Sequence, residues 1–216
     1  MPIVWSQNLA EKGKIAIWEI SETDEELYNM LQLDEKEVQH FQTLSKARQK
    51  QWLGSRVLLR TLLQTEQHNE LSIDEHRKPF LNNFPFEISI SHANHLAAVI
   101  IYEGKKVGVD IEKISERILK IKNKFLSSEE LSFIAAANEL EQLHVCWGAK
   151  ESLFKLYGKG SLPFIDGIKI ANFEYGKTAE IAASIAIPAY HANFNVQYLK
   201  YYLHICQLLT SNGMSR

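Results

Sequence analysis

The sequence has little of what marks a secreted or membrane-inserted protein. Its 216 residues contain two cysteines, Cys146 and Cys206, which lack C-x-x-C spacing and lie in apolar surroundings. We interpret both as buried free thiols, so neither a zinc scaffold nor a disulfide scaffold is expected. No run of about eighteen apolar residues occurs, and the first residues lack a basic segment before an apolar core. A cytoplasmic protein without a membrane span or signal peptide is therefore expected.

The chain also lacks a strong excess of charge of one sign. Its formal net charge is −2, which does not favour a nucleic-acid partner, and its content of 45% apolar and 23% charged residues is typical of a globular protein. Residues 1–103 hold 10 basic and 15 acidic residues, whereas residues 104–216 hold 14 basic and 11 acidic residues. The mildly basic second half suits an anionic cofactor and an acidic protein partner.

Apolar periodicity and turn signals predict mixed helices and strands along the whole chain. Residues 1–103 and residues 104–216 each contain strands and a long helix, and Glu103-Gly104-Lys105-Lys106 interrupts the pattern between them. The predicted elements are strands in 1–20, a helix start at Ser21, one or two helices over 35–63, a hairpin over 84–102 with its turn at 92–95, a strand over 107–112, a helix start at Ser127, a helix over 139–157 and a strand-like end over 196–209.

The most informative segment is Val107-Gly108-Val109-Asp110-Ile111-Glu112. Its apolar residues alternate with the others, which is the period of a strand, so Asp110 and Glu112 point the same way. Two neighbouring carboxylates repel each other unless a positive charge lies between them, and hard oxygen ligands suit a divalent cation such as Mg2+. The segment predicts a metal site, with an exposed edge strand whose acids face solvent as the alternative.

A second segment, residues 147–155, reads Trp-Gly-Ala-Lys-Glu-Ser-Leu-Phe-Lys. Its helical spacing predicts that Lys150, Glu151 and Lys155 share one side of a helix. Such a Glu–Lys pair is common on any exposed helix. Mg2+, however, binds one or two carboxylates together with phosphate oxygens, and lysine supplies charge to phosphates. The two segments together therefore predict a metal–phosphate site, with Asp110, Glu112 and Glu151 as metal ligands.

The order Gly-Val-Asp-x-Glu followed by Trp-x-x-Lys-Glu-x-x-x-Lys resembles the 4′-phosphopantetheinyl transferases of the Sfp type, which load carrier proteins from coenzyme A. The resemblance extends upstream to Lys78-Pro79-Phe80-Leu81 and to the Ser-His that ends residues 88–92, and downstream to Gly158-Lys159-Gly160. The chain departs from the family pattern at Arg77, where glycine is usual. Several matches in the right order are far more specific than any single one.

The resemblance implies an α+β fold. Family members are pseudodimers of two similar α/β halves, each a small sheet packed with a long helix, with the active site in the cleft between the halves. In this chain the resemblance implies halves over residues 1–103 and 104–216, with the boundary near Gly104. Such an internal pseudodimer needs no partner chain to complete its site, so a monomer is expected.

The resemblance also implies ligands for coenzyme A. It makes Arg48 and Arg56 candidates for the nucleotide phosphates, with Arg48 preferred, although either arginine alone is typical of a solvated helix face. Lys78, Ser91 and His92 become cofactor ligands in the same way. Without the resemblance, a lysine before proline and a histidine at a hairpin turn are typical of exposed surface positions.

The expected reaction moves the phosphopantetheine arm of coenzyme A to a serine of an apo acyl or peptidyl carrier protein and leaves 3′,5′-ADP. Asp110 and Glu112 would hold Mg2+, with Mn2+ as the alternative ion. Glu151 would be a further metal ligand and the general base. Lys155 would stabilise or protonate the leaving phosphate, and Lys150 would neutralise a pyrophosphate oxygen.

Two other functions stay open at this point. A metal-dependent nuclease or phosphodiesterase also gathers acids on a strand near a lysine, but Lys113 falls on the opposite face from Glu112. A carrier-protein-binding module without transfer activity is the second alternative. The intact charged residues of both segments argue against such a loss of activity.

Overall fold

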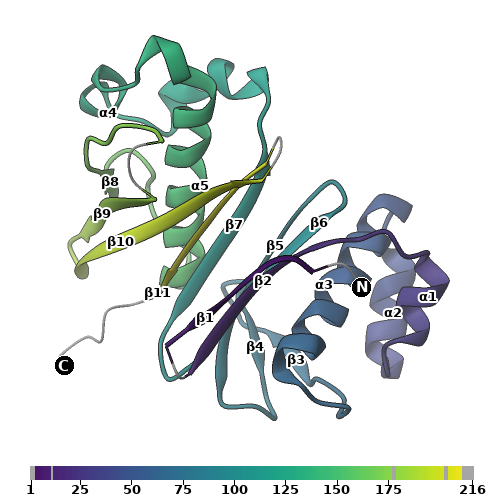
Figure 1. The fold of residues 1–216 in the computed structure, drawn as a ribbon. Helices are drawn as coiled ribbons and strands as arrows, with labels where there is room; N and C mark the ends of the chain where they lie inside the picture. Colours follow the sequence, from purple (N-terminus) through teal and green to yellow (C-terminus); the bar gives the residue numbers. More distant parts are fainter. Residues whose placement is uncertain (1–2, 11, 177–178, 202–203, 211–216) are drawn as a thin grey trace.

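The computed structural model describes residues 3–10, 12–176, 179–201 and 204–210, with side chains described as far as Tyr201. Groups of helices and groups of antiparallel strands follow one another along the chain, so the predicted α+β class is confirmed (Figure 1). The helices are α1 (Asp24–Asn29), α2 (Glu35–Thr43), α3 (Lys46–Leu63), α4 (Ser128–Ser132) and α5 (Glu139–Tyr157), with short 3-10 turns η1 (Glu116–Lys120), η2 (Lys122–Lys124) and η3 (Ala136–Asn138). The strands are β1 (Ile3–Leu9), β2 (Gly13–Glu19), β3 (Leu71–Ile73), β4 (Pro79–Leu81), β5 (Phe86–Ala93), β6 (Leu96–Glu103), β7 (Val107–Lys113), β8 (Ile168–Ile170), β9 (Glu180–Ile187), β10 (Tyr190–Tyr201) and β11 (His204–Thr210).

The first sheet has the strand order β1-β2-β6-β5 and is antiparallel throughout. The predicted hairpin is present: β5 pairs with β6, and Asn94 in the turn adopts a left-handed conformation with φ 54°. Helix α3 packs on one face of this sheet, where its Leu53 and Leu58 meet Trp18 and Val99 in a buried core. The apolar spacing in residues 35–63 had predicted this helical packing.

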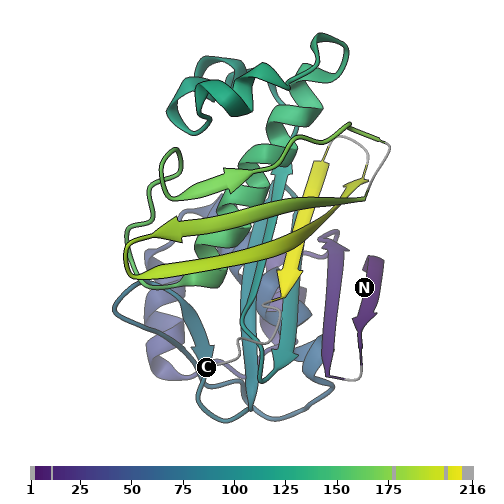
Figure 2. The same cartoon turned by 90° about the vertical axis from the view of Figure 1, so that its left-hand side faces the viewer.

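The second sheet has the order β7-β11-β10-β9-β8, and α5 packs against it. Figure 2 shows β9 and β10 passing in front of α5. The strand-like end predicted over 196–209 belongs to two antiparallel strands, in which Tyr201 pairs with His204. Its strand-like character is confirmed, whereas its division into two strands was not predicted, because residues 196–209 contain no glycine, proline, asparagine or aspartate to signal a turn.

The two sheets meet along β7, which lies at the edge of the second sheet. Val107, Val109 and Ile111 pack against Ile15 and Ile100 of the first sheet. On the free edge of β7, the N–H of Val109 donates to Ser89 Oγ at 3.1 Å, and the N–H of Ile111 donates to Ser91 Oγ at 3.3 Å. These bonds satisfy an edge that would otherwise expose unpaired backbone groups.

Gly104, the predicted boundary, lies in the turn between β6 and β7 with φ 76°, and this turn joins the strands of the two sheets. The division into two similar halves stays a prediction. Cys146 is buried and free, and burial raises the pKa of its thiol. The side chain of Cys206 lies outside the described residues. In the part of the chain that the structure describes, no helix is both long and apolar enough to span a bilayer.

Candidate active site

The strand β7 presents its second face to α5, as its alternation predicts. The close approach depends on Gly108, where a Cβ atom would lie 2.0 Å from the carbonyl oxygen of Ser152. This contact brings the following residues of β7 beneath the last turns of α5. The carboxylate of Asp110 is buried there, with 3% of the residue exposed.

Asp110 and Lys155 form the centre of the site. Lys155 Nζ donates to Asp110 Oδ1 at 2.7 Å, to Ser91 Oγ at 3.0 Å and to the carbonyl of Val109 at 3.0 Å. Ser91 Oγ donates to the same Asp110 oxygen at 3.0 Å. An ammonium group has three N–H donors, so all of them are engaged within the protein. The ion pair thus joins β5, β7 and α5.

The other oxygen of Asp110 is left without a partner. Oδ2 is buried and makes no hydrogen bond in the described structure. Burial, and after it the negative charges of Asp110 and Glu151, raise the pKa of Glu112 to about 7. Burial also raises the pKa of Glu151, with Asp110 as the next cause. The site thus contains a buried Asp110 oxygen without a hydrogen-bond partner and two carboxylates, Glu112 and Glu151, whose charged forms are disfavoured by burial. Such a set of oxygen ligands fits a divalent cation.

The three carboxylates do not converge on one point in this structure. Among the described residues, the group of three metal-binding side chains whose ligand atoms lie within 4.8 Å of one another is Asp34, Glu37 and His68. The metal-binding role of the acids on β7 and α5 therefore stays a proposal.

Trp147 has a polar role in addition to the packing role predicted for it. Its indole Nε1 donates to Glu112 Oε1 at 3.4 Å. Its ring lies 5.0 Å from that of Phe125 and 5.5 Å from that of Phe164, measured between centroids. The aromatic contacts hold the indole, so the indole in turn orients the Glu112 carboxylate. The sequence offered no signal for this bond, because β7 and α5 meet only in the tertiary structure.

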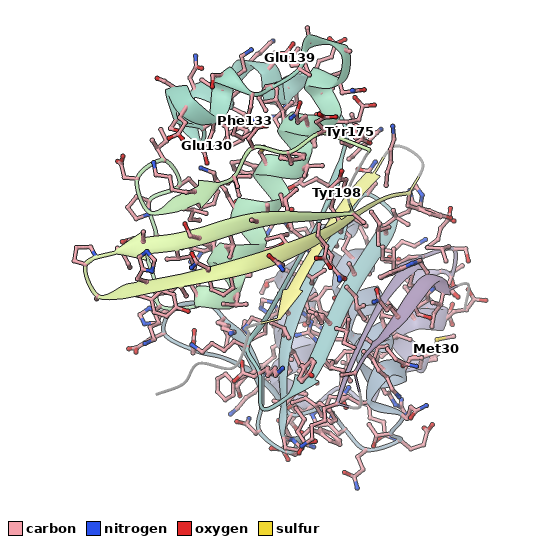
Figure 3. The ribbon with its side chains drawn as sticks, turned by 60° about the vertical axis from the view of Figure 1, so that its left-hand side comes forward. Met30, Glu130, Phe133, Glu139, Tyr175 and Tyr198 are labelled. Carbon is pink, nitrogen blue, oxygen red and sulfur yellow. The ribbon has the colours of Figure 1, made fainter. Side chains whose placement is uncertain are left out.

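Lys150 is not part of this cluster. Its Nζ is fully buried and donates to the Glu130 carboxylate at 2.9 Å and to the carbonyls of Phe164 and Ile168 at 2.7 and 2.9 Å. Figure 3 shows Glu130 beside α5 in the C-terminal half. Glu130 also accepts the N–H of Ile170 at 2.9 Å. Burial lowers the pKa of Lys150, while the bond to Glu130 opposes this effect.

The expectation that Lys150 shares a helix side with Glu151 and Lys155, and reaches a pyrophosphate, is thus corrected. Successive helical residues are rotated by about 100°, so Lys150 and Glu151 face different surroundings. Glu130 was missed because the segment at Ser127 predicted only a helix start, where Glu130 indeed completes a capping box. Its bond to Lys150 is a second role that the local pattern does not reveal.

The candidate arginines lie in different environments. The guanidinium of Arg56 lies 3.4 Å from the Trp52 ring centre, and its Nε is 3.6 Å from Glu37 Oε1. Burial lowers the pKa of Arg56 to about 10. Arg48 is exposed and acts electrostatically on His92, whose pKa is lowered by desolvation and then by Lys155 and Arg48. The structure thus brings Arg48 towards the site, whereas Arg56 is engaged with Glu37 and Trp52.

A cavity of about 160 Å³ lies beside the Asp110 cluster, and Lys78, Lys155, Ser89 and Gly158 are among its lining residues. Gly158 ends α5 in the left-handed conformation with φ 61°, and a Cβ there would lie 2.6 Å from Lys78 Cδ. Lys78 Nζ lies 3.4 Å from a carboxylate oxygen of Glu87. The cavity thus carries two lysines next to the proposed metal ligands.

Further basic side chains lie near Lys78. Arg77 also lines the cavity and adopts φ 67°, the left-handed conformation that favours glycine, at the position where the family usually has glycine. The pKa of Lys106 is lowered by desolvation and then by the charges of Lys78 and Lys159. Positive charge therefore gathers at this end of the site. Ser91, in contrast, is a structural link, because its hydroxyl is committed to Asp110, Lys155 and the backbone of β7.

Comparisons with known proteins support the resemblance seen in the sequence. Residues 106–206 match the family model described as the 4′-phosphopantetheinyl transferase superfamily. The chain is 32% identical over 125 residues to the 4′-phosphopantetheinyl transferase ffp of Bacillus subtilis, an alignment that covers 56% of this chain and 53% of that protein. It is 31% identical over 126 residues to the transferase Sfp of Bacillus subtilis strain 168, with the same two coverages.

A further relative is the 4′-phosphopantetheinyl transferase gsp of Aneurinibacillus migulanus, which is 33% identical over 90 residues, or 40% of this chain and 37% of that protein. The chain thus spans about half the length of the curated relatives it matches. The matched family segment contains β7 and α5, and with them Asp110, Glu112, Glu151 and Lys155.

Proposed function

We propose that this chain, a member of the 4′-phosphopantetheinyl transferase superfamily of the Sfp type, transfers the 4′-phosphopantetheine arm of coenzyme A to a serine of an apo carrier protein. The second product would be 3′,5′-ADP. The observation that carries the proposal is the buried Asp110, held by Lys155 and Ser91 with one free oxygen, beside the desolvated carboxylates of Glu112 and Glu151.

Asp110, Glu112 and Glu151 are the residues that would hold Mg2+, with Mn2+ as the alternative. When bound, the ion supplies positive charge to a pyrophosphate and to the departing phosphate. Hydrogen bonds within the protein fix the orientation of two of these carboxylates. Lys155 and Ser91 fix one oxygen of Asp110, and Trp147 orients Glu112.

Glu151 is the proposed base for the serine hydroxyl. A general base works best when its pKa approaches the pH at which the enzyme operates. The raised pKa of Glu151, caused by burial and by the charge of Asp110, moves this carboxyl in that direction. The proton would leave the serine hydroxyl for a Glu151 carboxylate oxygen as the serine oxygen attacks the phosphorus of the phosphopantetheine arm. The pyrophosphate bond from this phosphorus to the departing 3′,5′-ADP would break in the same step.

Lys155 would stabilise the charge that develops on the leaving phosphate. Its three donors are already engaged, so a direct bond to phosphate requires exchange of one of them. The Val109 carbonyl and the Ser91 hydroxyl are neutral partners, and exchange of either one keeps the ion pair with Asp110. Lys78, His92 and Arg48 are the proposed ligands for the phosphates of coenzyme A. Lys78 lines the basic cavity, while Arg48 and Lys155 act electrostatically on His92.

The partner proposed for the mildly basic second half is an acidic acyl or peptidyl carrier protein, because opposite charge speeds encounter and fixes orientation. We also propose that the chain acts as a monomer. Neither a membrane nor a nucleic acid enters the proposed reaction.

Intact-mass spectrometry tests the function. An apo acyl carrier protein is incubated with the chain, coenzyme A and Mg2+, and a second sample contains EDTA. We expect a mass gain of one phosphopantetheine group that depends on the metal. No gain with several carrier proteins would overturn the proposal. Magnesium-dependent cleavage of a nucleic acid, assayed in parallel, would support the nuclease, and tight binding of the apo carrier without a mass gain would support the binding module.

A further inference from the structure

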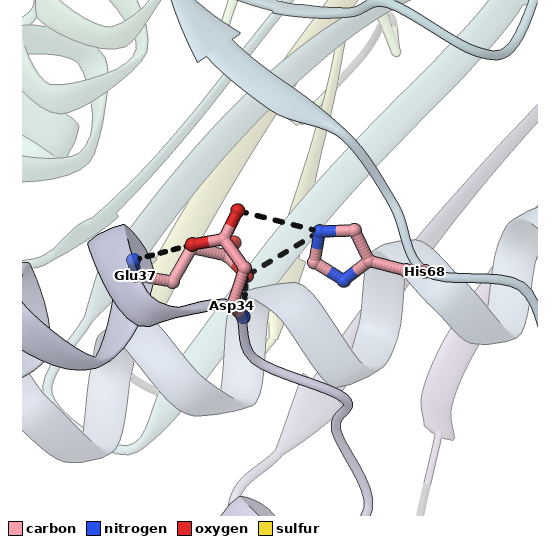
Figure 4. A group of neighbouring side chains, drawn as sticks. All are labelled: Asp34, Glu37 and His68. Carbon is pink, nitrogen blue, oxygen red and sulfur yellow. Dashed lines mark hydrogen bonds and ion pairs between the residues drawn. The ribbon is translucent and has the colours of Figure 1, made fainter.

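A separate group of metal-binding side chains lies in the N-terminal half. Asp34 and Glu37 lie at the start of α2, and His68 follows α3 (Figure 4). Their ligand atoms lie within 4.8 Å of one another. His68 Nε2 is 3.9 Å from Asp34 Oδ2 and 3.7 Å from Glu37 Oε2. The reaction proposed above uses none of these three side chains.

A backbone contact fixes the tautomer of His68. Its Nδ1 hydrogen-bonds to the carbonyl of Gln32. A carbonyl oxygen can only accept, so Nδ1 carries the proton and Nε2 keeps its lone pair in the neutral ring. Histidines that bind metals are oriented in this way, because the second ring nitrogen donates to a carbonyl or a carboxylate. The nitrogen that remains available is the one that faces the two acids.

Both carboxylates direct an oxygen towards His68 while they cap α2. Asp34 Oδ1 accepts the N–H of Glu37 at 2.8 Å, which leaves Oδ2 towards His68. Glu37 Oε2 accepts the N–H of Asp34 at 3.3 Å and also faces His68, while its Oε1 faces Arg56. The capping box therefore holds the two acids in place before any ion arrives. When His68 is neutral, the two carboxylates of Asp34 and Glu37 carry two negative charges and Arg56 carries one positive charge. The group therefore has a net charge of about −1, which favours a cation.

The spacing and the donor types suit a transition-metal ion. Zn2+ lies about 2.0–2.2 Å from nitrogen and oxygen ligands, so neighbouring ligands of a tetrahedral site are about 3.4 Å apart. The observed 3.7 and 3.9 Å need small side-chain shifts to reach that value. An imidazole with two carboxylates favours Zn2+ or a similar ion over Mg2+, which prefers oxygen ligands.

The surroundings offer space and a further donor. A cavity of about 20 Å³ adjoins the group, and Glu37, His68 and Asn69 are among its lining residues. A space of about 10–15 Å³ is enough for one water molecule. Asn69 Oδ1 is buried and has no hydrogen-bond partner in the described part of the chain. A buried orphan acceptor calls for a donor or a cation, so Asn69 would bind the ion or a water molecule bound to it.

We propose that Asp34, Glu37 and His68 bind one divalent transition-metal ion, for which Zn2+ is the reference. The ion would fasten the start of α2 to the segment between α3 and β3. The inference does not depend on the proposed transferase function. The competing occupant is a proton on His68 Nε2, which would make the group a histidinium paired with two carboxylates.

Calorimetric titration of the metal-free chain of 216 residues with ZnCl2 tests the proposal. Excess MgCl2 is present so that the oxygen ligands of the candidate active site are occupied by Mg2+. We expect one zinc ion per chain. Asp34→Asn should weaken binding by about 100-fold or more, because loss of an outer-shell partner alone costs 10–100-fold. Asparagine caps a helix as well as aspartate does, so this variant keeps α2. His68→Gln should have the same effect.

His191→Gln is the matched control, since His191 is exposed on β10, and it should bind zinc as the unmodified chain does. The absence of zinc binding in the presence of Mg2+ would overturn the proposal and leave the histidinium pair. Equal zinc affinity in the unmodified chain, Asp34→Asn and His68→Gln would also overturn it. The heat of binding is independent of transferase activity, so failure of the proposed function would not affect the result.

Discussion

Two lysines on α5 differ in burial and in whether their carboxylate partner can still bind a ligand. Lys150 is fully buried, with its three donors on Glu130 and two backbone carbonyls. Lys155 also uses three donors, but its side chain is 27% exposed and its carboxylate partner, Asp110, keeps one oxygen free. The first arrangement is complete, whereas the second can still accept a cation or a phosphate. A lysine–glutamate spacing alone therefore does not identify a site, because the side of the helix on which each residue falls decides its role.

The largest expected effect concerns Glu151, on the side of α5 that carries Lys155. Glu151→Gln removes the proposed base with little change in size, and we expect the transfer rate to fall by about 10²–10⁴-fold. The fold should persist, because the neutral amide removes repulsion with Asp110. Intact-mass rates and a thermal melt check this. Glu141→Gln, on the same helix at the surface ion pair with Lys200, should keep the full rate. A Glu151→Gln protein that transfers at the unmodified rate would contradict the assignment.

The next effect concerns the other side of the helix. Lys150→Met leaves Glu130 buried without its cation, and we expect a loss of about 3–5 kcal/mol in the free energy of unfolding. Urea denaturation measures it. The double variant Lys150→Met, Glu130→Leu should recover much of the loss, because it removes both charges. Lys155→Met should slow transfer, and it should lower the free energy of unfolding less than Lys150→Met does. Equal losses of unfolding free energy in Lys150→Met and Lys155→Met would contradict the view that Lys150 is structural and Lys155 belongs to the active site.

The smallest effect concerns pH. His144 on α5 is buried, and its Nε2 accepts the N–H of Ser115 at 2.9 Å; burial lowers its pKa below the ordinary value. The unfolded chain therefore takes up a proton first as the pH falls below about 6.5. His144 contributes stability above that pH and loses it below, by up to about 1.4 kcal/mol per pH unit.

In His144→Gln the free energy of unfolding should depend less on pH between neutral and mildly acidic conditions. Urea titrations at several pH values measure the slope, and the exposed His191→Gln variant should keep the slope of the unmodified chain. An unchanged slope in His144→Gln would show that this histidine is not held neutral by its surroundings.

Much of the local structure could be predicted from the sequence because it depends on neighbouring residues. Turn residues and apolar periodicity predicted the hairpin of β5 and β6 and placed α5 over residues 139–157. The role of the two serines of β5 was harder to predict than these local elements. Ser89 and Ser91 recur with the period of a strand, so a common partner could have been inferred, but that partner, the free edge of β7, is apparent only in the folded chain.

The sequence by itself determined that β7 has two different faces and that acids and lysines recur on α5, because side-chain direction follows from the period of each element. Only the tertiary structure decided which of these groups meet. Lys150 joins Glu130, Lys155 joins Asp110, and His68 meets the acids at the start of α2. The physical reason is that contacts between distant segments depend on how the elements pack against one another, and the period of any one element carries no information about that packing.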